Sequence, residues 1–99
     1  MAGPVYKLFL CRFTEAWYQL SKEEQDQVVA AEMERSKQTG CKTVVFCDCS
    51  WSAEQWMFFG VEEYPDIESV QRVVQLQREV NWGRYMQGIS FLGTKTEEE

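Results

Sequence analysis

Hydrophobic positions along this chain alternate in some segments and recur at helical spacing in others. Residues 5–13 are rich in β-branched and aromatic side chains and short enough to form a strand. A capping box formed by Ser21 and Glu24 predicts a helix over roughly residues 21–39, and Gly40 stands where a C-terminal cap belongs. Residues 41–49 predict a second strand.

The second half of the chain predicts two strands and one helix. Residues 54–63 form the expected third strand, and the short connection before them favours an antiparallel hairpin. Pro65 and Asp66 open a second helix, whose apolar stripe runs to Val80. Residues 85–94 complete the pattern as the last strand, so the predicted order is β-α-β-β-α-β.

This order is that of the ferredoxin-like α+β fold, a four-stranded antiparallel sheet with two helices on one face. In such a sheet only one side of each strand is expected to be apolar. Here both sides are apolar. On the first strand one side carries Val5, Phe9 and Phe13, and the other Tyr6, Leu8 and Leu10. The uncovered face needs a second sheet, so we expect a homodimer in which two sheets pair into a barrel.

Length and charge narrow the class of protein. The 99 residues predict a single domain over residues 1–96, followed by a frayed acidic tail at residues 97–99. Sixteen acidic against ten basic residues give a net charge of −6, which argues against nucleic acid as a partner. No apolar run approaches the roughly 20 residues of a membrane span, and no signal peptide is recognisable, so a soluble cytoplasmic protein is expected.

The chain has four cysteines and no histidine. Without a secretory signal, reduced thiols packed as small hydrophobic side chains are favoured over disulfides. The spacing of Cys47 and Cys49 differs from the pairs that hold zinc, and a second ligand pair is missing. The sequence therefore predicts neither a metal site nor a bound cofactor.

Four segments resemble the dimeric α+β barrel superfamily. These are the stretch Trp-Tyr-Gln-Leu-Ser-Lys-Glu-Glu at 17–24 and residues 56–66, 82–85 and 88–94. The resemblance covers residues 5–94. The superfamily includes quinol monooxygenases of antibiotic biosynthesis, small polyketide cyclases, lactone isomerases, EthD-like proteins and stress-responsive barrel proteins.

The resemblance implies a ligand pocket between the sheet and the helices of each subunit. It implies a cofactor-independent enzyme, a cyclase, isomerase or oxygenase that acts on an aromatic or polyketide-like substrate in a specialised metabolic pathway. Some members bind haem or remove protons through a histidine. Neither mechanism can apply here, because this chain has no histidine. The alternative is a non-catalytic ligand-binding or stress-related barrel dimer.

Charged residues near strand ends are candidates for chemistry. Arg12 and Asp48 lie among apolar neighbours, where arginine can polarise a carbonyl and aspartate can move a proton. The alternative for both is a salt bridge or a solvated strand end. Glu62 and Glu63 close the third strand, so one carboxylate faces the helices and is a candidate base. The alternative is that the strand end frays and both carboxylates are solvated.

Aromatic residues are the candidates for binding a hydrophobic or aromatic small molecule. We expect Tyr85 to supply a catalytic hydroxyl, and Trp82 to stack on the substrate. Further candidate substrate-binding residues are Tyr6, Phe58 and Tyr64. The alternative for most of these side chains is packing in the core or in a dimer interface, where aromatic residues are also enriched.

Overall fold

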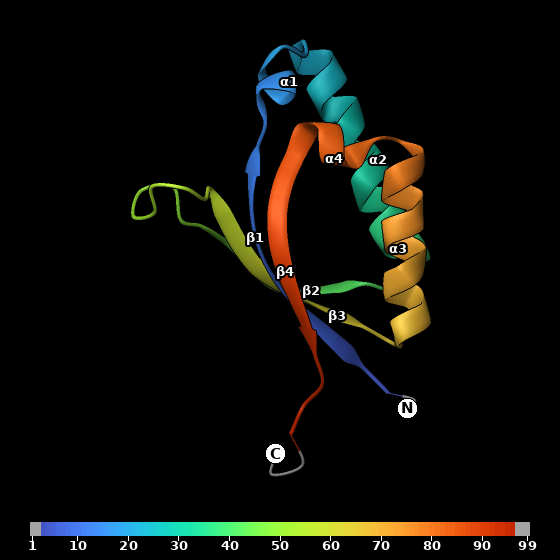
Figure 1. The fold of residues 1–99 in the computed structure, drawn as a ribbon. Helices are drawn as coiled ribbons and strands as arrows, with labels where there is room; N and C mark the ends of the chain where they lie inside the picture. The colour runs from blue at the N-terminus through green and yellow to red at the C-terminus, as the bar shows by residue number, and fades with distance from the viewer. Residues whose placement is uncertain (1–2, 97–99) are drawn as a thin grey trace.

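A computed structural model describes residues 3–96, within which four strands form one antiparallel sheet (Figure 1). The strands are β1 (Val5–Phe13), β2 (Lys42–Asp48), β3 (Phe58–Tyr64) and β4 (Met86–Gly93). They lie in the order β2-β3-β1-β4, and each neighbouring pair is antiparallel. The predicted β-α-β-β-α-β topology is confirmed, including the hairpin of β2 and β3. The tail predicted at residues 97–99 lies outside the described residues.

The helices lie on one side of the sheet (Figure 1). The two long ones are α2 (Lys22–Gln38) and α3 (Ile67–Glu79), as the sequence predicted. Two single turns were not predicted, α1 (Glu15–Tyr18) and α4 (Trp82–Tyr85). In the part of the chain that is described, no helix is long and apolar enough to cross a membrane.

Local hydrogen bonds set the ends of α2. The Ser21 hydroxyl accepts from the Glu24 amide at 3.1 Å, and the Glu24 carboxylate accepts from the Ser21 amide at 2.8 Å. Gly40 follows the helix with a φ of +75°, a left-handed conformation that glycine adopts without a steric penalty. A Cβ at Gly40 would also lie 3.2 Å from the ring of Pro65, so the chain passes close to the start of α3 there.

Helix α3 carries the small apolar core. Asp66 caps it by accepting hydrogen bonds from the Ser69 amide at 2.8 Å and the Ser69 hydroxyl at 2.7 Å. These two bonds, the one from the hydroxyl first, lower the pKa of Asp66. Val70 and Val73 are buried against the sheet, where they form a cluster with Val5, the first residue of β1, and Tyr64, the last residue of β3.

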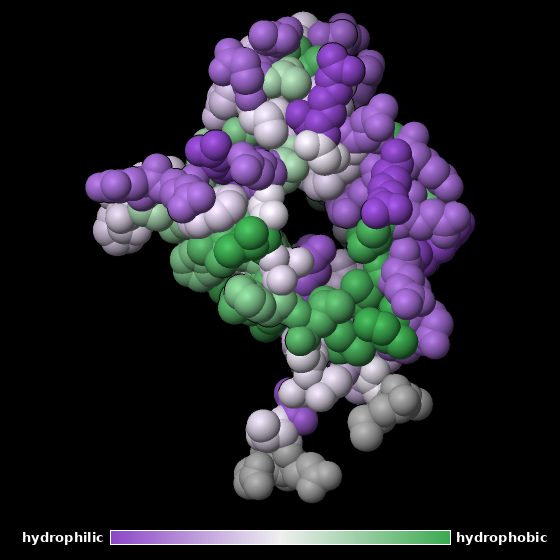
Figure 2. Space-filling model, viewed as in Figure 1, coloured by the Kyte–Doolittle hydropathy of each residue, from purple (hydrophilic) through white to green (hydrophobic). Residues whose placement is uncertain are grey.

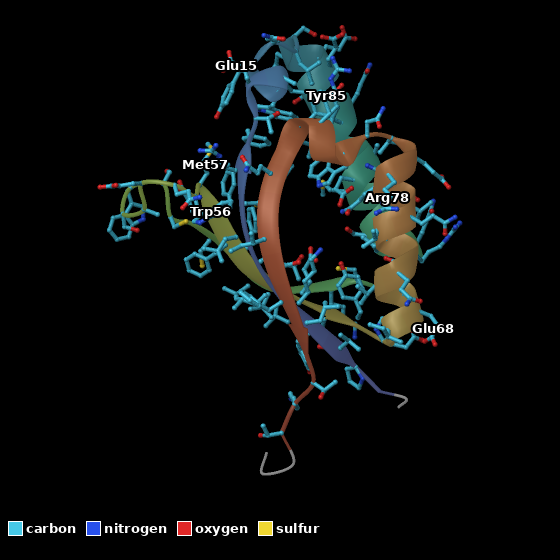
Figure 3. The ribbon with its side chains drawn as sticks, in the orientation of Figure 1. Glu15, Trp56, Met57, Glu68, Arg78 and Tyr85 are labelled. Atoms are coloured by element: carbon cyan, nitrogen blue, oxygen red, sulfur yellow. The ribbon has the colours of Figure 1, made fainter. Side chains whose placement is uncertain are left out.

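The predicted third strand began four residues too early. β3 starts at Phe58, and residues 54–57 belong to a loop that projects from the sheet (Figure 1). The chain turns back there because the amides of Ser52 and Ala53 both donate to the carbonyl of Cys49, at 3.0 and 2.8 Å. Trp56 and Met57 lie at the base of this loop (Figure 3). Their apolar side chains are typical of a strand in sequence, but the turn places both residues in the loop before β3.

The last strand begins at Met86 instead of Tyr85, because a helical turn precedes it. Asn81 starts that turn with a φ of +57°, a left-handed conformation that asparagine tolerates better than most residues. The amide of Thr14 donates to the carbonyl of Tyr85 at 3.0 Å. This bond ties α4 to the end of β1 and fixes where β4 enters the sheet.

The helical layer contacts the sheet over only part of its length. Figure 2 shows an opening through the molecule between the sheet and the helices. The buried cluster around Tyr64 closes the space near the start of α3. The opening exposes part of the helix-facing side of the sheet, which is where the sequence predicted a ligand pocket.

Candidate functional site

The helix-facing side of β3 carries a carboxylate bonded to a phenol. Tyr64 belongs to the buried cluster with α3, so Glu62, two residues earlier on the strand, faces the same way. The Tyr64 hydroxyl donates to Glu62 Oε1 at 2.8 Å. Glu62 itself is only half-buried and lies opposite Lys7 of β1. The pair therefore combines a fully buried donor with a carboxylate that a ligand can reach.

Burial keeps the tyrosine of this pair protonated. The side chain of Tyr64 is 1% exposed, and burial first, then the charge of Glu62, raises its pKa. Cys41 packs against the same buried cluster, and burial raises the pKa of its thiol. A protonated Tyr64 can only donate to Glu62, so it holds the carboxylate in one orientation.

Aromatic rings cover the rest of this side of the sheet. The Phe9 and Phe46 ring centroids are 6.1 Å apart, and Phe46 stacks on Phe58 at 5.2 Å. Phe58 meets Phe13 edge to face at 5.8 Å, and Phe13 stacks on Trp17 at 4.2 Å. We call these five rings the aromatic row. Phe46 is 56% exposed, so the row offers a ring surface to a flat ligand.

Two of the predicted site residues lie on the other side of the sheet. Tyr6 and Arg12 alternate with the helix-facing residues of β1 and so belong to its outer face. Arg12 Nε donates to Gln87 at 3.1 Å, and Lys95 lies 5.8 Å above the Tyr6 ring. A hollow of about 370 Å³ on this outer face is lined by Tyr6, Leu8, Val61 and residues 91–95. The sheet therefore separates Tyr6 and Arg12 from Glu62.

Asp48 ends β2 in a turn. Its carboxylate accepts from the Ser50 hydroxyl at 2.6 Å and from the Ser50 amide at 2.8 Å. These bonds, the hydroxyl's first, lower the pKa of Asp48, and the side chain is exposed. These bonds within the turn give Asp48 a structural role and leave no sign of a catalytic one.

Trp82 and Tyr85 line a groove in the helical layer. The groove lies between α2 and α4, has a volume of about 300 Å³, and also takes in Val80 at the end of α3. Tyr85 stands at one end of the helical layer (Figure 3). Neither Glu62 nor Tyr64 borders this groove. The predicted site residues thus lie in separate parts of the structure. Among them, only Glu62 and Tyr64 are joined by a direct hydrogen bond.

Sequence reasoning missed Arg35, which also lines this groove. Arginine on a helix is normally exposed, but Arg35 is buried. Its guanidinium is bonded to Glu32, which is in turn bonded to Gln77 of α3. The available signal was the three-residue spacing of Glu32 and Arg35, which places both on one helix face.

The cysteines do not gather into a metal site. Among the described residues there is no group of three or more cysteine, aspartate and glutamate side chains placed to hold an ion. All four cysteines, at positions 11, 41, 47 and 49, are free thiols.

No family model matches the sequence, and neither does any curated protein. Solved structures match its fold. A haem-binding protein from Thermus thermophilus aligns with 98% of this chain at a TM-score of 0.76 and 16% identity, and a candidate chlorite dismutase at 0.71 and 17%. The chain spans less than half of either protein, 41% and 47% respectively.

A further match covers nearly the whole of both chains. A Dabb family protein with a ferredoxin-like fold from Mesorhizobium loti aligns with 95% of this chain and 98% of its own, at a TM-score of 0.62 and 16% identity. Identities this low establish the fold alone. They confirm the ferredoxin-like α+β fold and, at the level of the fold, the resemblance to the dimeric α+β barrel superfamily.

Proposed function

We propose that this protein is a cofactor-independent enzyme that acts on an aromatic or polyketide-like small molecule at the helix-facing side of its sheet. The observation that carries this proposal is the 2.8 Å bond from Tyr64 to Glu62, on the helix-facing side of the sheet that also carries the aromatic row. Cyclisation, isomerisation and cofactor-free oxygenation share a first step, in which a base removes a proton next to a carbonyl or from a phenol. Glu62 is the base in this proposal.

Each neighbour of Glu62 has a role in that step. Tyr64 donates to one carboxylate oxygen and leaves the other free to accept the substrate proton. The exposed ring of Phe46 holds the flat part of the substrate. Lys7, opposite Glu62 on β1, supplies a positive charge on the face where an enolate or phenolate forms. The proton moves from substrate to Glu62, and the electron pair stays on the substrate.

Haem, which the Thermus thermophilus neighbour binds, does not fit this chain through a histidine ligand. The sequence has no histidine, and the polar groups on the helix-facing side of β3 are a carboxylate and a buried phenol. We therefore derive no step through haem. A hydroxynitrile lyase from Passiflora edulis shares the fold at a TM-score of 0.53 and 11% identity, which shows that an enzyme is built on it.

A homodimer is part of this proposal. The outer face of the sheet carries exposed apolar side chains, among them Leu8 of β1 at 43%, and Ile89 and Phe91 of β4 at 49% and 61%. Two such faces pack into a barrel core, and an interface of at least about 1,000 Å² is expected. The same contact covers the outer hollow beside Tyr6 and leaves the helix-facing side of the sheet free.

Exchange of carbon-bound protons tests the proposed base without the natural substrate. The probe is 2-tetralone, an aromatic ketone, whose loss of α-protons in D₂O is followed by NMR. We expect the wild-type protein to accelerate exchange, and Glu62→Gln to lower that rate by about 10²–10⁴-fold. Glu63→Gln is the matched control, because Glu63 adjoins Glu62 but faces the outer side. Lack of acceleration by the wild type, or equal rates for wild type and Glu62→Gln, overturns the proposal.

The second candidate function is non-catalytic ligand binding by a barrel dimer. The observation that favours it is the groove at Trp82 and Tyr85, which has aromatic walls without the bonded carboxylate and phenol of β3. Saturable binding of 2-tetralone without any proton exchange would support this function over the enzyme.

A further inference from the structure

The groove between α2 and α4 has the size and surface of a small-molecule site. Its volume of about 300 Å³ is at the lower end of the range typical of ligand pockets. Its apolar part is formed by Leu20, Val28, Ala31 and Val80. Trp82 and Tyr85 add two aromatic side chains, both half-buried. The wall is thus apolar and aromatic, with few polar groups.

A buried guanidinium forms part of this wall. Arg35 is only 8% exposed, and its Nε and Nη2 atoms donate to the same oxygen of Glu32, at 3.2 and 3.0 Å. Gln77 of α3 donates to the other oxygen of Glu32 at 2.5 Å. A guanidinium has five N–H donors, so these two bonds leave donors for a molecule in the groove. The two bonds to Glu32, whose other oxygen is held by Gln77, fix the orientation of Arg35 before a ligand arrives.

The charges around the groove favour a neutral ligand. Glu32 already balances the charge of Arg35, and Glu24, whose carboxylate is bonded to the Ser21 amide, also lines the groove. An incoming carboxylate would add a negative charge beside two glutamates. A neutral carbonyl oxygen can accept from Arg35 without that repulsion.

We propose that this groove is a second ligand site, which binds a neutral aromatic molecule carrying a carbonyl oxygen. Trp82 and Tyr85 contact the ring, and Arg35 donates to the carbonyl. The inference goes beyond the proposed enzyme, since Glu62 and Tyr64 do not border the groove. It stands whether or not Glu62 removes a proton.

Two probes of similar shape test the proposal on the wild-type protein. 2-Acetonaphthone carries a neutral carbonyl, and 2-naphthoate carries a carboxylate on the same fused ring. Binding is followed by the NMR signal of the Trp82 indole N–H, and the indole of Trp51, which is 84% exposed outside the groove, is the internal control. We expect saturable shifts at Trp82 but not at Trp51, and about tenfold weaker binding of 2-naphthoate. Equal or tighter binding of 2-naphthoate overturns the proposal.

A pair of neighbouring alanines locates the site. Ala31 lines the groove and Ala30 does not, and both are exposed positions on α2. Ala31→Phe fills the groove and is expected to abolish the Trp82 shift, whereas Ala30→Phe retains it. Arg35→Gln is expected to weaken the binding of 2-acetonaphthone about tenfold. If that variant fails to fold, the comparison of Ala31→Phe with Ala30→Phe still tests the site. Absence of a Trp82 shift in the wild type, or equal loss in both phenylalanine variants, contradicts the site.

Discussion

Tyr64 and Glu62, two residues apart on β3, are joined by a 2.8 Å hydrogen bond on the helix-facing side of the sheet. Tyr64→Phe removes the hydroxyl and keeps the buried ring. We expect the free energy of unfolding to fall by about 1–2 kcal/mol, because the bond is made to a charged acceptor. Urea unfolding measures this loss. An unchanged unfolding midpoint would mean that the bond contributes nothing to stability.

The outer face of the sheet is expected to form the dimer. Phe91→Asp places a charge on an exposed outer-face position, so it should leave the subunit folded and weaken the pairing of two sheets. Sedimentation at micromolar concentration should give a dimer for the wild type and a monomer for the variant. Val29→Asp is the control, because Val29 is equally apolar and 40% exposed but lies on α2. A monomeric wild type would sink this prediction.

Gly60 allows the aromatic row to lie against the sheet. A Cβ at this position would lie 2.7 Å from the Phe9 ring and 2.7 Å from the carbonyl oxygen of Val45. Gly60→Ala must displace the Phe9 ring or separate β2 from β3, and is expected to cost about 1–3 kcal/mol. In contrast, a Cβ at Gly83 meets nothing within 4 Å, so Gly83→Ala should be neutral or stabilising. Thermal unfolding of both variants checks the difference.

Burial of Cys11 is expected to make the free energy of unfolding fall as the pH becomes alkaline. Burial is the main cause that raises the pKa of its thiol from 9.0 to about 11. Between these values the unfolded chain loses the thiol proton while the folded protein retains it, so stability falls as pH rises through this window. The urea midpoint should therefore decrease more steeply between about pH 9 and about pH 11 in the wild type than in Cys11→Ala. Parallel pH profiles for the two proteins would contradict this.

Local signals in the sequence predicted most of the fold. The capping box of Ser21 and Glu24, the glycine at position 40 and the cap at Asp66 all act within four residues, so sequence alone identifies both long helices. The start of β3 was wrong because it depends on where the loop after Cys49 folds back. The turn α4 was missed because its position depends on Thr14, which is distant in sequence.

The site was less predictable than the fold, for the same reason. Alternation along a strand places Glu62 on one face or the other, but only the pairing of strands and helices shows which face meets α3. Arg35 is bonded to Glu32, and Glu32 is held by Gln77, which lies 45 residues from Glu32 in sequence. Arg12 and Tyr6 were predicted site residues together with Glu62, but both lie on the outer face of the sheet, whereas Glu62 lies on the helix-facing side.

The central claim is that an aromatic ligand binds on the helix-facing side of the sheet, beside Glu62. Intermolecular nuclear Overhauser effects between 2-tetralone and the wild-type protein test it most directly, because they report which face of the sheet the ligand touches. We predict contacts from the probe to the ring protons of Phe46 and Phe58. Contacts confined to Leu8 and Phe91 would place the ligand on the outer face and contradict the claim.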